Sequence, residues 1–154
     1  MLRISKLTDY STVILGEMAR SKTLTFTTAE LAASTGIAQP TVSKVLKLLG
    51  KSSLVLSIRG SNGGYQLADK PEQISVAQII SAMEGPIGIT ECCTTSETCD
   101  HVSHCHISGN WGVINRAIET TLQTISLADL VSPVSALVEM TVSVDSSAMV
   151  QSSR

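Results

Sequence analysis

The feature that most constrains this fold is a pair of helical patterns joined by a short turn that contains a glycine. Thr27 and Glu30 have the spacing of a capping box, in which each side chain accepts a backbone N–H at the start of a helix. They predict a helix over 28–34, and Gly36 ends it. Because a second helical pattern begins within a few residues, the segment is typical of a helix-turn-helix.

The second pattern begins at Pro40, which suits the first turn of a helix because its missing N–H costs nothing there. Apolar residues follow at helical spacing, namely Val42, Val45, Leu46, Leu48 and Leu49. The opposite face carries small polar and basic residues, namely Thr41, Ser43, Lys44, Lys47 and Lys51. A helix with such a face after such a turn indicates a recognition helix for DNA.

A β-hairpin is predicted directly after this helix. Residues 54–58 are strand-like, residues 60–64 form a glycine-rich turn, and residues 65–67 begin a second strand. A hairpin in this position makes the element a winged helix.

Charge is divided unevenly along the chain. Residues 1–70 carry nine Lys or Arg against four Asp or Glu, a net charge of +5, whereas residues 71–154 carry two against nine, a net charge of −7. The overall charge of −2 does not argue against DNA, because a nucleic acid meets only the face that it contacts. A small helical fold that uses the same geometry for packing alone is the alternative, and the basic face favours DNA binding.

We therefore expect double-stranded promoter DNA as a partner. Lys44, Lys47 and Arg59 are expected to contact phosphates, which position a protein on the duplex. Gln39, Thr41 and Ser43 are the candidates for contacts with base edges. The full set of candidate DNA-binding residues is Thr28, Gln39, Pro40, Thr41, Ser43, Lys44, Lys47, Arg59, Gly60, Asn62 and Gly63.

Further helical patterns flank this region. A helix over 8–20 is expected to be capped by Thr8 or Asp9, and Ser75 is expected to cap the helical segment 71–84. Asn110 is expected to cap a long helix with one apolar stripe, made of Trp111, Ile114, Ile118, Thr121, Leu122 and Ile125. A single stripe on a helix in so short a chain needs a packing partner, and a second subunit is the natural one.

The expected fold class is mainly α with a small β-wing, a winged helix-turn-helix plus a long C-terminal dimerisation helix. Five segments are predicted: a DNA-binding region at 1–70, a linking helix at 71–88, a cysteine-rich loop at 89–108, the dimerisation helix at 109–130 and a weakly structured tail at 131–154.

All four cysteines lie within fourteen residues, at positions 92, 93, 99 and 105. The start of the chain lacks the pattern of a signal peptide, so we expect a cytoplasmic protein with reduced thiols rather than a disulfide framework. A metal or iron–sulfur site is one interpretation of Cys92, Cys93, Cys99 and Cys105. A zinc knuckle, which needs closer cysteine pairs, and a thiol–disulfide switch are the others. His101, His104 and His106 lie in the same loop and are either nitrogen ligands or solvated side chains.

No apolar run approaches the length of a transmembrane helix, so no membrane is expected as a partner. The sequence has no Ser-His-Asp arrangement, and the glycines at 60–64 lack the helix that follows a phosphate-binding loop. We therefore expect neither an enzyme nor a small-molecule substrate.

Several short motifs in this chain resemble the winged-helix regulators of the Rrf2 family, which has IscR-like and NsrR-like branches. The resemblance covers about residues 1–130, and its matching segments are 1–10, 57–65, 74–76 and the three spaced cysteines. Segments 84–87, 91–92 and 109–111 are most similar to the branch that regulates the SUF system of iron–sulfur cluster assembly.

The resemblance implies a homodimer that holds an iron–sulfur cluster in each cysteine loop. Its ligands would be Cys99, Cys105 and one of Cys92 or Cys93. The fourth ligand stays open, because the histidine of IscR-like members is replaced by Ser108 here. The partner subunit's Asp9, as in NsrR-like members, His106 or the spare cysteine could take that place. Neither a two-iron nor a four-iron cluster follows.

The function expected from sequence is that of a homodimeric repressor whose DNA affinity is set by the cluster and which regulates SUF genes. The alternatives are a zinc-stabilised winged-helix module that binds another protein, and a repressor of other genes that senses nitric oxide or redox state.

Overall fold

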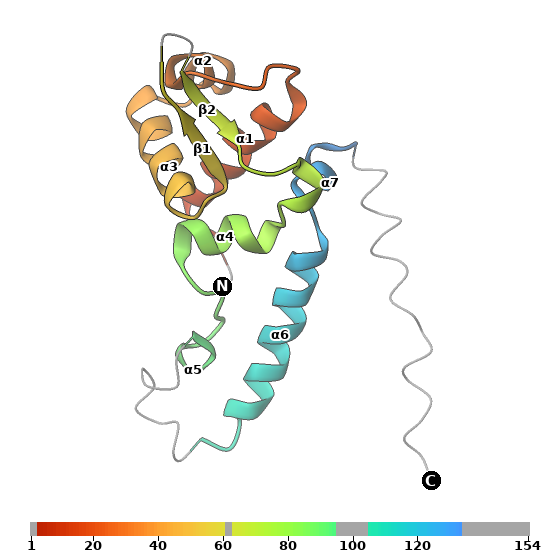
Figure 1. Ribbon diagram of the computed structural model, residues 1–154. Helices are drawn as coiled ribbons and strands as arrows, with labels where there is room; N and C mark the ends of the chain where they lie inside the picture. Colours follow the sequence, from red (N-terminus) through yellow and green to blue (C-terminus); the bar gives the residue numbers. More distant parts are fainter. Residues whose placement is uncertain (1–2, 61–62, 95–104, 134–154) are drawn as a thin grey trace.

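Helix α1 (Lys6–Arg20) lies at the centre of the fold and contacts α2, α3, α4, α7 and the wing. The computed structural model describes residues 3–60, 63–94 and 105–133. In chain order the elements are α1, α2 (Thr28–Thr35), α3 (Gln39–Lys51), β1 (Val55–Ile58), β2 (Gly64–Leu67), the 3-10 helix η1 (Pro71–Gln73), α4 (Val76–Glu84), α5 (Glu91–Thr94), α6 (Ser108–Thr124) and α7 (Leu127–Val131) (Figure 1). This confirms the expected fold class, mainly helical with a two-stranded wing.

The helix-turn-helix forms where the sequence predicts it. The capping box is present at the start of α2, and Gly36 ends this helix with a positive φ of 70°, which glycine adopts without strain. Pro40 stands in the first turn of α3. The start of α1 differs from the prediction, because the N-cap is Ser5, whose side chain accepts the N–H of Thr8.

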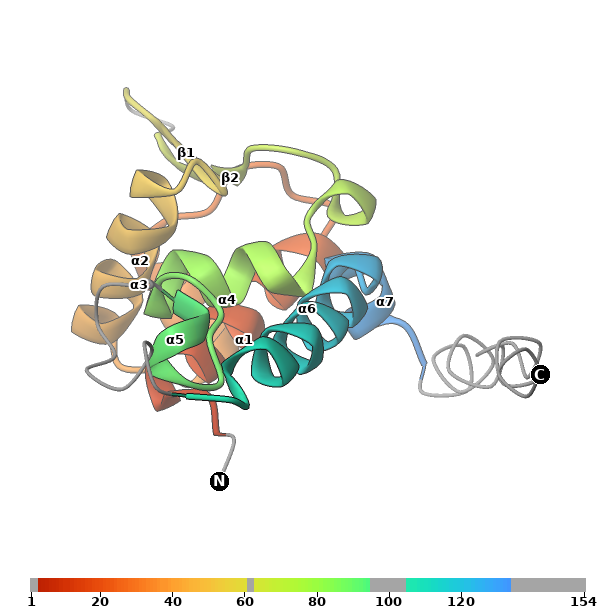
Figure 2. The ribbon, with the colours of Figure 1, turned by 90° about the horizontal axis from the view of Figure 1, so that it is seen from below.

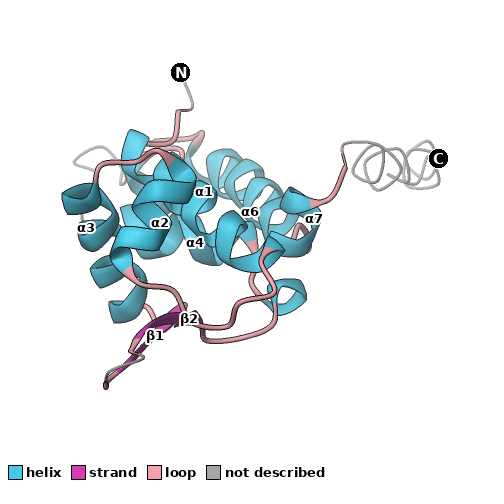
Figure 3. Ribbon diagram, turned by 90° about the horizontal axis from the view of Figure 1, so that it is seen from above, coloured by secondary structure: helices cyan, strands magenta, loops and turns pink. Residues whose placement is uncertain are grey.

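The wing is an antiparallel hairpin in which Val55 lies opposite Leu67. A third extended segment joins its inner edge, where the N–H groups of Phe26 and Tyr65 each donate to the other residue's carbonyl, at 2.8 and 2.7 Å. Gly64 is required there because the carbonyl of Phe26 occupies the space that a Cβ would need. Seen from above, the hairpin projects to one side of the helices (Figure 3).

The hydrophobic core is shared by the first four helices, the wing and α7, and it is built almost entirely from aliphatic side chains. Its fully buried members are Ile14, Leu15, Leu31, Val42, Val45, Leu46, Leu49, Val55, Ile74, Ile79 and Leu127. Burying one such side chain stabilises the fold by about 1.5–3 kcal/mol. Four of the five apolar residues of α3 are buried and Leu48 is half-buried, so its polar and basic face is turned to solvent.

Helix α6 runs away from the winged helix, and α5 lies beside it (Figures 1 and 2). Three sequence predictions are corrected here. The segment 109–130 is two helices and not one, because the chain bends at Ile125 and Ser126 to pair with the residues before α4. The N–H of Val76 donates to the carbonyl of Ile125 at 2.9 Å, and the N–H of Leu127 donates to the carbonyl of Ile74 at 2.7 Å.

The second correction concerns the start of α6. Asn110 is exposed and lies inside the helix, which begins at Ser108 with Ile107 at the N-cap position and no side-chain cap. The third concerns the cysteine-rich loop predicted over 89–108, where residues 91–94 form the single-turn helix α5. The predicted tail from residue 134 onward lies outside the described residues.

Candidate functional site

The solvent face of α3 carries the predicted DNA-binding side chains together. Gln39, Pro40, Ser43, Lys44 and Lys47 are exposed, on the face opposite the buried aliphatic residues. Two further candidates, Thr28 at the start of α2 and Thr41, are half-buried. The capping box fixes the start of α2 and Pro40 stands in the first turn of α3, and these two helices pack against each other.

The wing carries a further exposed positive charge. Arg59 and Gly60 are exposed at the end of β1, and Gly63 is half-buried just before β2, while Asn62 lies outside the described residues. Across residues 3–60, 63–94 and 105–133 the recorded ion pair is that of Arg20 with Glu17, at 3.7 Å. The side chains of Lys44, Lys47 and Arg59 are therefore available for phosphate oxygens.

Two of the four thiols lie on α5 and share one hydroxyl group. The Oγ1 atom of Thr90 lies 3.1 Å from the Sγ atom of Cys92 and 3.2 Å from that of Cys93. Both thiols are half-buried, as is Cys105, which stands three residues before the start of α6. Helix α5 packs against α6. The structure therefore places Cys92 and Cys93 beside the long helix.

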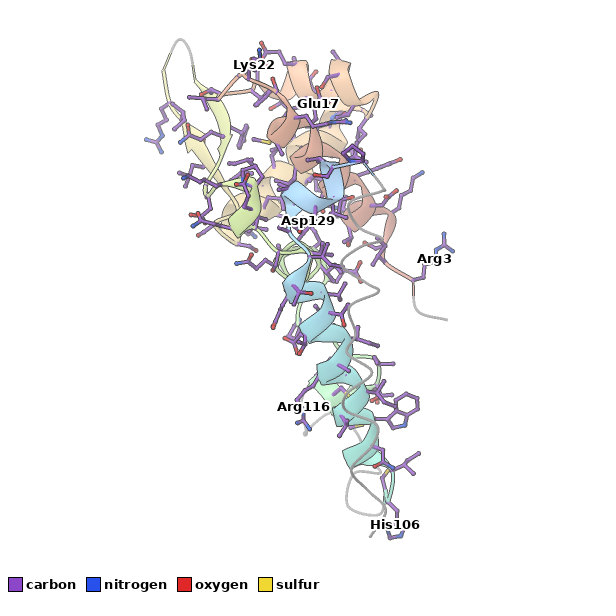
Figure 4. All side chains as sticks on the ribbon, turned by 90° about the vertical axis from the view of Figure 1, so that its right-hand side faces the viewer. Arg3, Glu17, Lys22, His106, Arg116 and Asp129 are labelled. Carbon is purple, nitrogen blue, oxygen red and sulfur yellow. The ribbon has the colours of Figure 1, made fainter. Side chains whose placement is uncertain are left out.

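The other predicted ligands are of two kinds, those outside the described residues and those at exposed positions. Cys99, His101 and His104 lie outside the described residues. His106 is exposed at the far end of α6 from the winged helix (Figure 4), and Asp9 is exposed in the first turn of α1. Within the described part of the chain, no three His, Cys, Asp or Glu residues are close enough together to hold a metal ion.

Asn115 is a site residue that the sequence reasoning missed. It is 5% exposed in the middle of α6, where its Oδ1 atom accepts the N–H of Ile89 and its Nδ2 atom donates to the carbonyl of Ile87, both at 3.0 Å. The signal in the sequence is an asparagine, a weak helix former, within an otherwise regular helical pattern. Its buried amide ties the segment that precedes α5 to α6.

A carboxylate links the end of α4 to the start of α1. The Oε1 atom of Glu84 accepts the hydroxyl of Thr8 at 2.5 Å and the backbone N–H of Ser5 at 2.7 Å. These two hydrogen bonds, that of the Thr8 hydroxyl first, hold the pKa of Glu84 below its ordinary value. Glu84 was singled out in the sequence only as part of a family segment.

An apolar groove of about 430 Å³ runs along α6 on its solvent side. Its lining is made of Val113, Ile114, Ala117, Ile118, Thr121 and Leu122. Val113 is 58% exposed and Ile114 is 45% exposed, values that are high for side chains of this kind. Trp111 and Ile125 of the predicted stripe are half-buried and do not line this groove. No helix in the described part of the chain has the length and apolar character needed to span a bilayer.

The fold and this surface define a winged-helix DNA-binding regulator. The chain belongs to the Rrf2 family, whose model is described as an iron-dependent transcriptional regulator and matches residues 4–133. The family is one of transcriptional regulators that bind DNA, and not of enzymes.

Curated relatives support the same assignment. The chain is 33% identical to protein Rrf2 of Nitratidesulfovibrio vulgaris over 66% of its own length and 67% of the relative's. It is 32% identical to the transcriptional regulator IscR of Aliivibrio salmonicida over 66% of its own length and 60% of the relative's. It covers only 55% of a regulator from Haemophilus influenzae to which it is 42% identical.

Solved structures match over most of the chain. CymR, the global cysteine regulator of B. subtilis, superposes with a TM-score of 0.65 at 28% identity over 85% of this chain and 97% of that one. IscR of T. potens superposes with a TM-score of 0.63 at 28% identity, over 84% and 85% of the two chains.

Proposed function

We propose that this chain is a homodimeric repressor whose affinity for promoter DNA is controlled by an iron–sulfur cluster, and that SUF cluster-assembly genes are among its targets. The observation that carries the proposal is the position of α5. The helix that holds Cys92 and Cys93 packs against α6, which also bears the apolar groove. A change at the thiols would therefore act on the helix where a second subunit docks.

The donor set fits such a cluster. Thiolates are its usual ligands, and Cys99, Cys105 and one of Cys92 or Cys93 would supply three of them. The adjacent thiols of Cys92 and Cys93 both contact Thr90, so one local segment offers either sulfur. When bound, the cluster would supply a group that reacts with oxygen and nitric oxide.

The fourth ligand has three candidates. The partner subunit's Asp9 and this chain's His106 are the candidates, because both positions are exposed and neither is buried in the core. The spare cysteine of the adjacent pair is the third candidate. Asp9→Ala, His106→Ala, Cys92→Ser and Cys93→Ser, each compared for iron content, would distinguish them.

A dimer gives the DNA-binding surface its second half. The exposed apolar side chains of α6 need a partner, and an isologous contact between two copies satisfies both at once. Two winged helices would then meet two half-sites of an operator.

Anaerobic purification tests the proposal. We expect a coloured protein with visible absorption, containing iron and sulfide, whose retardation of a SUF promoter fragment changes when the cluster is removed. Retardation should also weaken as salt is raised, because phosphate contacts release counterions. A colourless protein without iron or sulfide after anaerobic reconstitution contradicts the cluster, and bound zinc would support a zinc-stabilised module.

Thiol sensing without a cluster is a second candidate function. Two adjacent thiols share one hydroxyl here, and the chain is 28% identical to the protein described as the global cysteine regulator of B. subtilis. Iron-free protein whose DNA affinity changes on treatment with diamide and recovers with dithiothreitol would favour this candidate.

A further inference from the structure

Asn115 is an unusual residue for its position, because it is a polar side chain buried in the middle of a helix. It is 5% exposed, and both ends of its amide are hydrogen-bonded: the oxygen to the N–H of Ile89 and the nitrogen to the carbonyl of Ile87, each at 3.0 Å. A buried amide is retained at low cost only when both ends are satisfied in this way.

The residues that Asn115 holds lead directly to the thiols. Ile89 is followed by Thr90, whose hydroxyl contacts the Sγ atoms of Cys92 and Cys93 at 3.1 and 3.2 Å. The carbonyl of Thr90 accepts the N–H of Cys93 at 2.9 Å, which closes the first turn of α5. The side-chain amide of Asn115 thus fixes the backbone immediately before the thiols. Thr90, the next residue, contacts both sulfur atoms through its hydroxyl.

The same stretch of α6 forms the apolar groove on its other side. Ile114 stands beside Asn115 in the sequence and lines the groove, and so does Ile118, one turn later. Asn115 is therefore placed between the thiol segment and the surface proposed for the second subunit. One turn of an α-helix rises about 5.4 Å, so these two features lie on the same short piece of α6.

We propose that Asn115 is a positioning residue that registers the thiol-bearing segment 87–93 against α6. The sensing role of that registration rests on the proposed function. The registration itself is a property of the metal-free chain, and it can be measured without a cluster.

Hydrogen exchange of the wild-type protein is the first test. Amide exchange resolved by NMR should show the N–H of Ile89 protected to the same degree as amides of α6. Exchange of this N–H at the rate of an unstructured amide would overturn the proposal, and this result depends on no variant.

Three variants give the second test. Asn115→Leu removes both hydrogen bonds, and Asn115→Asp keeps the acceptor and loses the donor. Gln123→Leu is the matched control, because Gln123 lies on the same helix, is exposed, and bonds only through a 3.4 Å contact with Glu119. Exchange of peptide 87–93 is compared with exchange of the wing. The alkylation rate of Cys92 and Cys93 by iodoacetamide is compared between each variant and the wild type.

We expect Asn115→Leu to raise both rates by at least about tenfold, because it removes two hydrogen bonds that are each worth about 1 kcal/mol. Asn115→Asp should raise them at least as much, because it sets an unpaired carboxylate oxygen against the carbonyl of Ile87 in a buried site. The wing should be unchanged. Equal increases in exchange at 87–93 and in the wing would show general destabilisation and overturn the positioning role. Exchange and alkylation rates in the Asn115 variants equal to those of Gln123→Leu would also overturn it.

Reconstitution with ferrous iron and sulfide separates the two proposals. If the wild-type protein forms no cluster, the proposed cofactor is contradicted. The positioning role is still supported if the Asn115 variants differ from the wild type in exchange and alkylation. Asn115→Leu protein that binds the cluster as the wild type does, with unchanged exchange at 87–93, contradicts the positioning role.

Discussion

The hydroxyl of Thr8 donates a hydrogen bond of 2.5 Å to the Oε1 atom of Glu84, which lies 76 residues further along the chain. Thr8 is fully buried in the first turns of α1, and Glu84 is the last residue of α4. The contact joins the first helix of the winged-helix region to the point where the chain leaves it for the thiol segment. The carboxylate also accepts the N–H of Ser5, so it holds the start of α1 at two points.

Removing this contact should destabilise the protein. Glu84→Gln replaces a charge-assisted hydrogen bond with a weaker one, and we expect the free energy of unfolding in urea to fall by about 1 kcal/mol. Thr8→Val keeps the shape of the side chain but removes the donor. Because both changes break the same bond, the double variant should lose less than the sum of the two. Glu72→Gln, at an exposed position of η1, is the control. Strictly additive losses would show that the two residues act separately.

Acid should destabilise the protein through three hydrogen-bonded carboxylates. The pKa of Glu30 is lowered by the backbone N–H and then the hydroxyl of Thr27, and that of Asp129 by the hydroxyl and then the N–H of Ser126. The pKa of Glu84 is lowered in the same way. Because these values lie below those of the unfolded chain, the unfolded state binds protons first as the pH falls.

The stabilisation is therefore complete above the unfolded-state pKa values, about 4, and is lost as the pH falls through the folded-state values. We expect the Tm to be nearly constant between about pH 7 and 5 with respect to these groups and to fall below that range. A variant with Glu30→Gln, Glu84→Gln and Asp129→Asn should have a lower Tm at pH 7 and a flatter acid profile. An unchanged profile in this variant would assign acid sensitivity to other groups.

A charge placed in the α6 groove should prevent dimerisation. Ile114 is 45% exposed in the single chain, so Ile114→Glu leaves the core intact but would bury an unpaired carboxylate between two copies. An uncompensated buried charge costs about 3 kcal/mol or more, so the dimer Kd should rise at least about 100-fold. Sedimentation velocity measures the change, with Gln123→Glu as the control. A dimer that survives with unchanged affinity would place the subunit contact elsewhere.

Substitutions in the DNA-binding surface should affect overall affinity where a residue contacts phosphates and sequence preference where it contacts bases. Arg59→Ala should weaken binding to all sequences about equally and reduce the slope of log K against log salt by about 1, if Arg59 contacts a phosphate. Arg116→Ala removes the same charge from α6, away from the winged helix, and is the matched control (Figure 4).

Ser43 is exposed on α3, and Ser43→Ala should change the preference among operator variants rather than the overall affinity. Competition mobility shifts with single-base operator variants measure this. A uniform loss from Ser43→Ala together with altered preference from Arg59→Ala would reverse the roles assigned to helix and wing.

The sequence by itself determined the winged helix, because the signals for its elements are local. A capping box needs residues three apart, a helix end needs a glycine that adopts positive φ, and an amphipathic helix needs apolar residues within two turns. Thr27, Glu30, Gly36 and Pro40 stand in the structure where these rules place them. The prediction of Thr8 or Asp9 as the N-cap of α1 was wrong by about one turn, because Ser5 has the same capping chemistry and lies earlier in the chain.

Only the tertiary structure decided how the second half of the chain is attached. Helices α6 and α7 separate because Ile125 and Leu127 bond to residues around position 75, and Asn115 is buried because it meets Ile87 and Ile89. Glu84 accepts a hydrogen bond from Thr8, from which it is separated in the sequence by the whole winged helix. Such pairings join residues that are far apart along the chain, so no local sequence pattern predicts them. They are fixed when packing brings the two segments together and their polar groups, removed from water, must bond to each other.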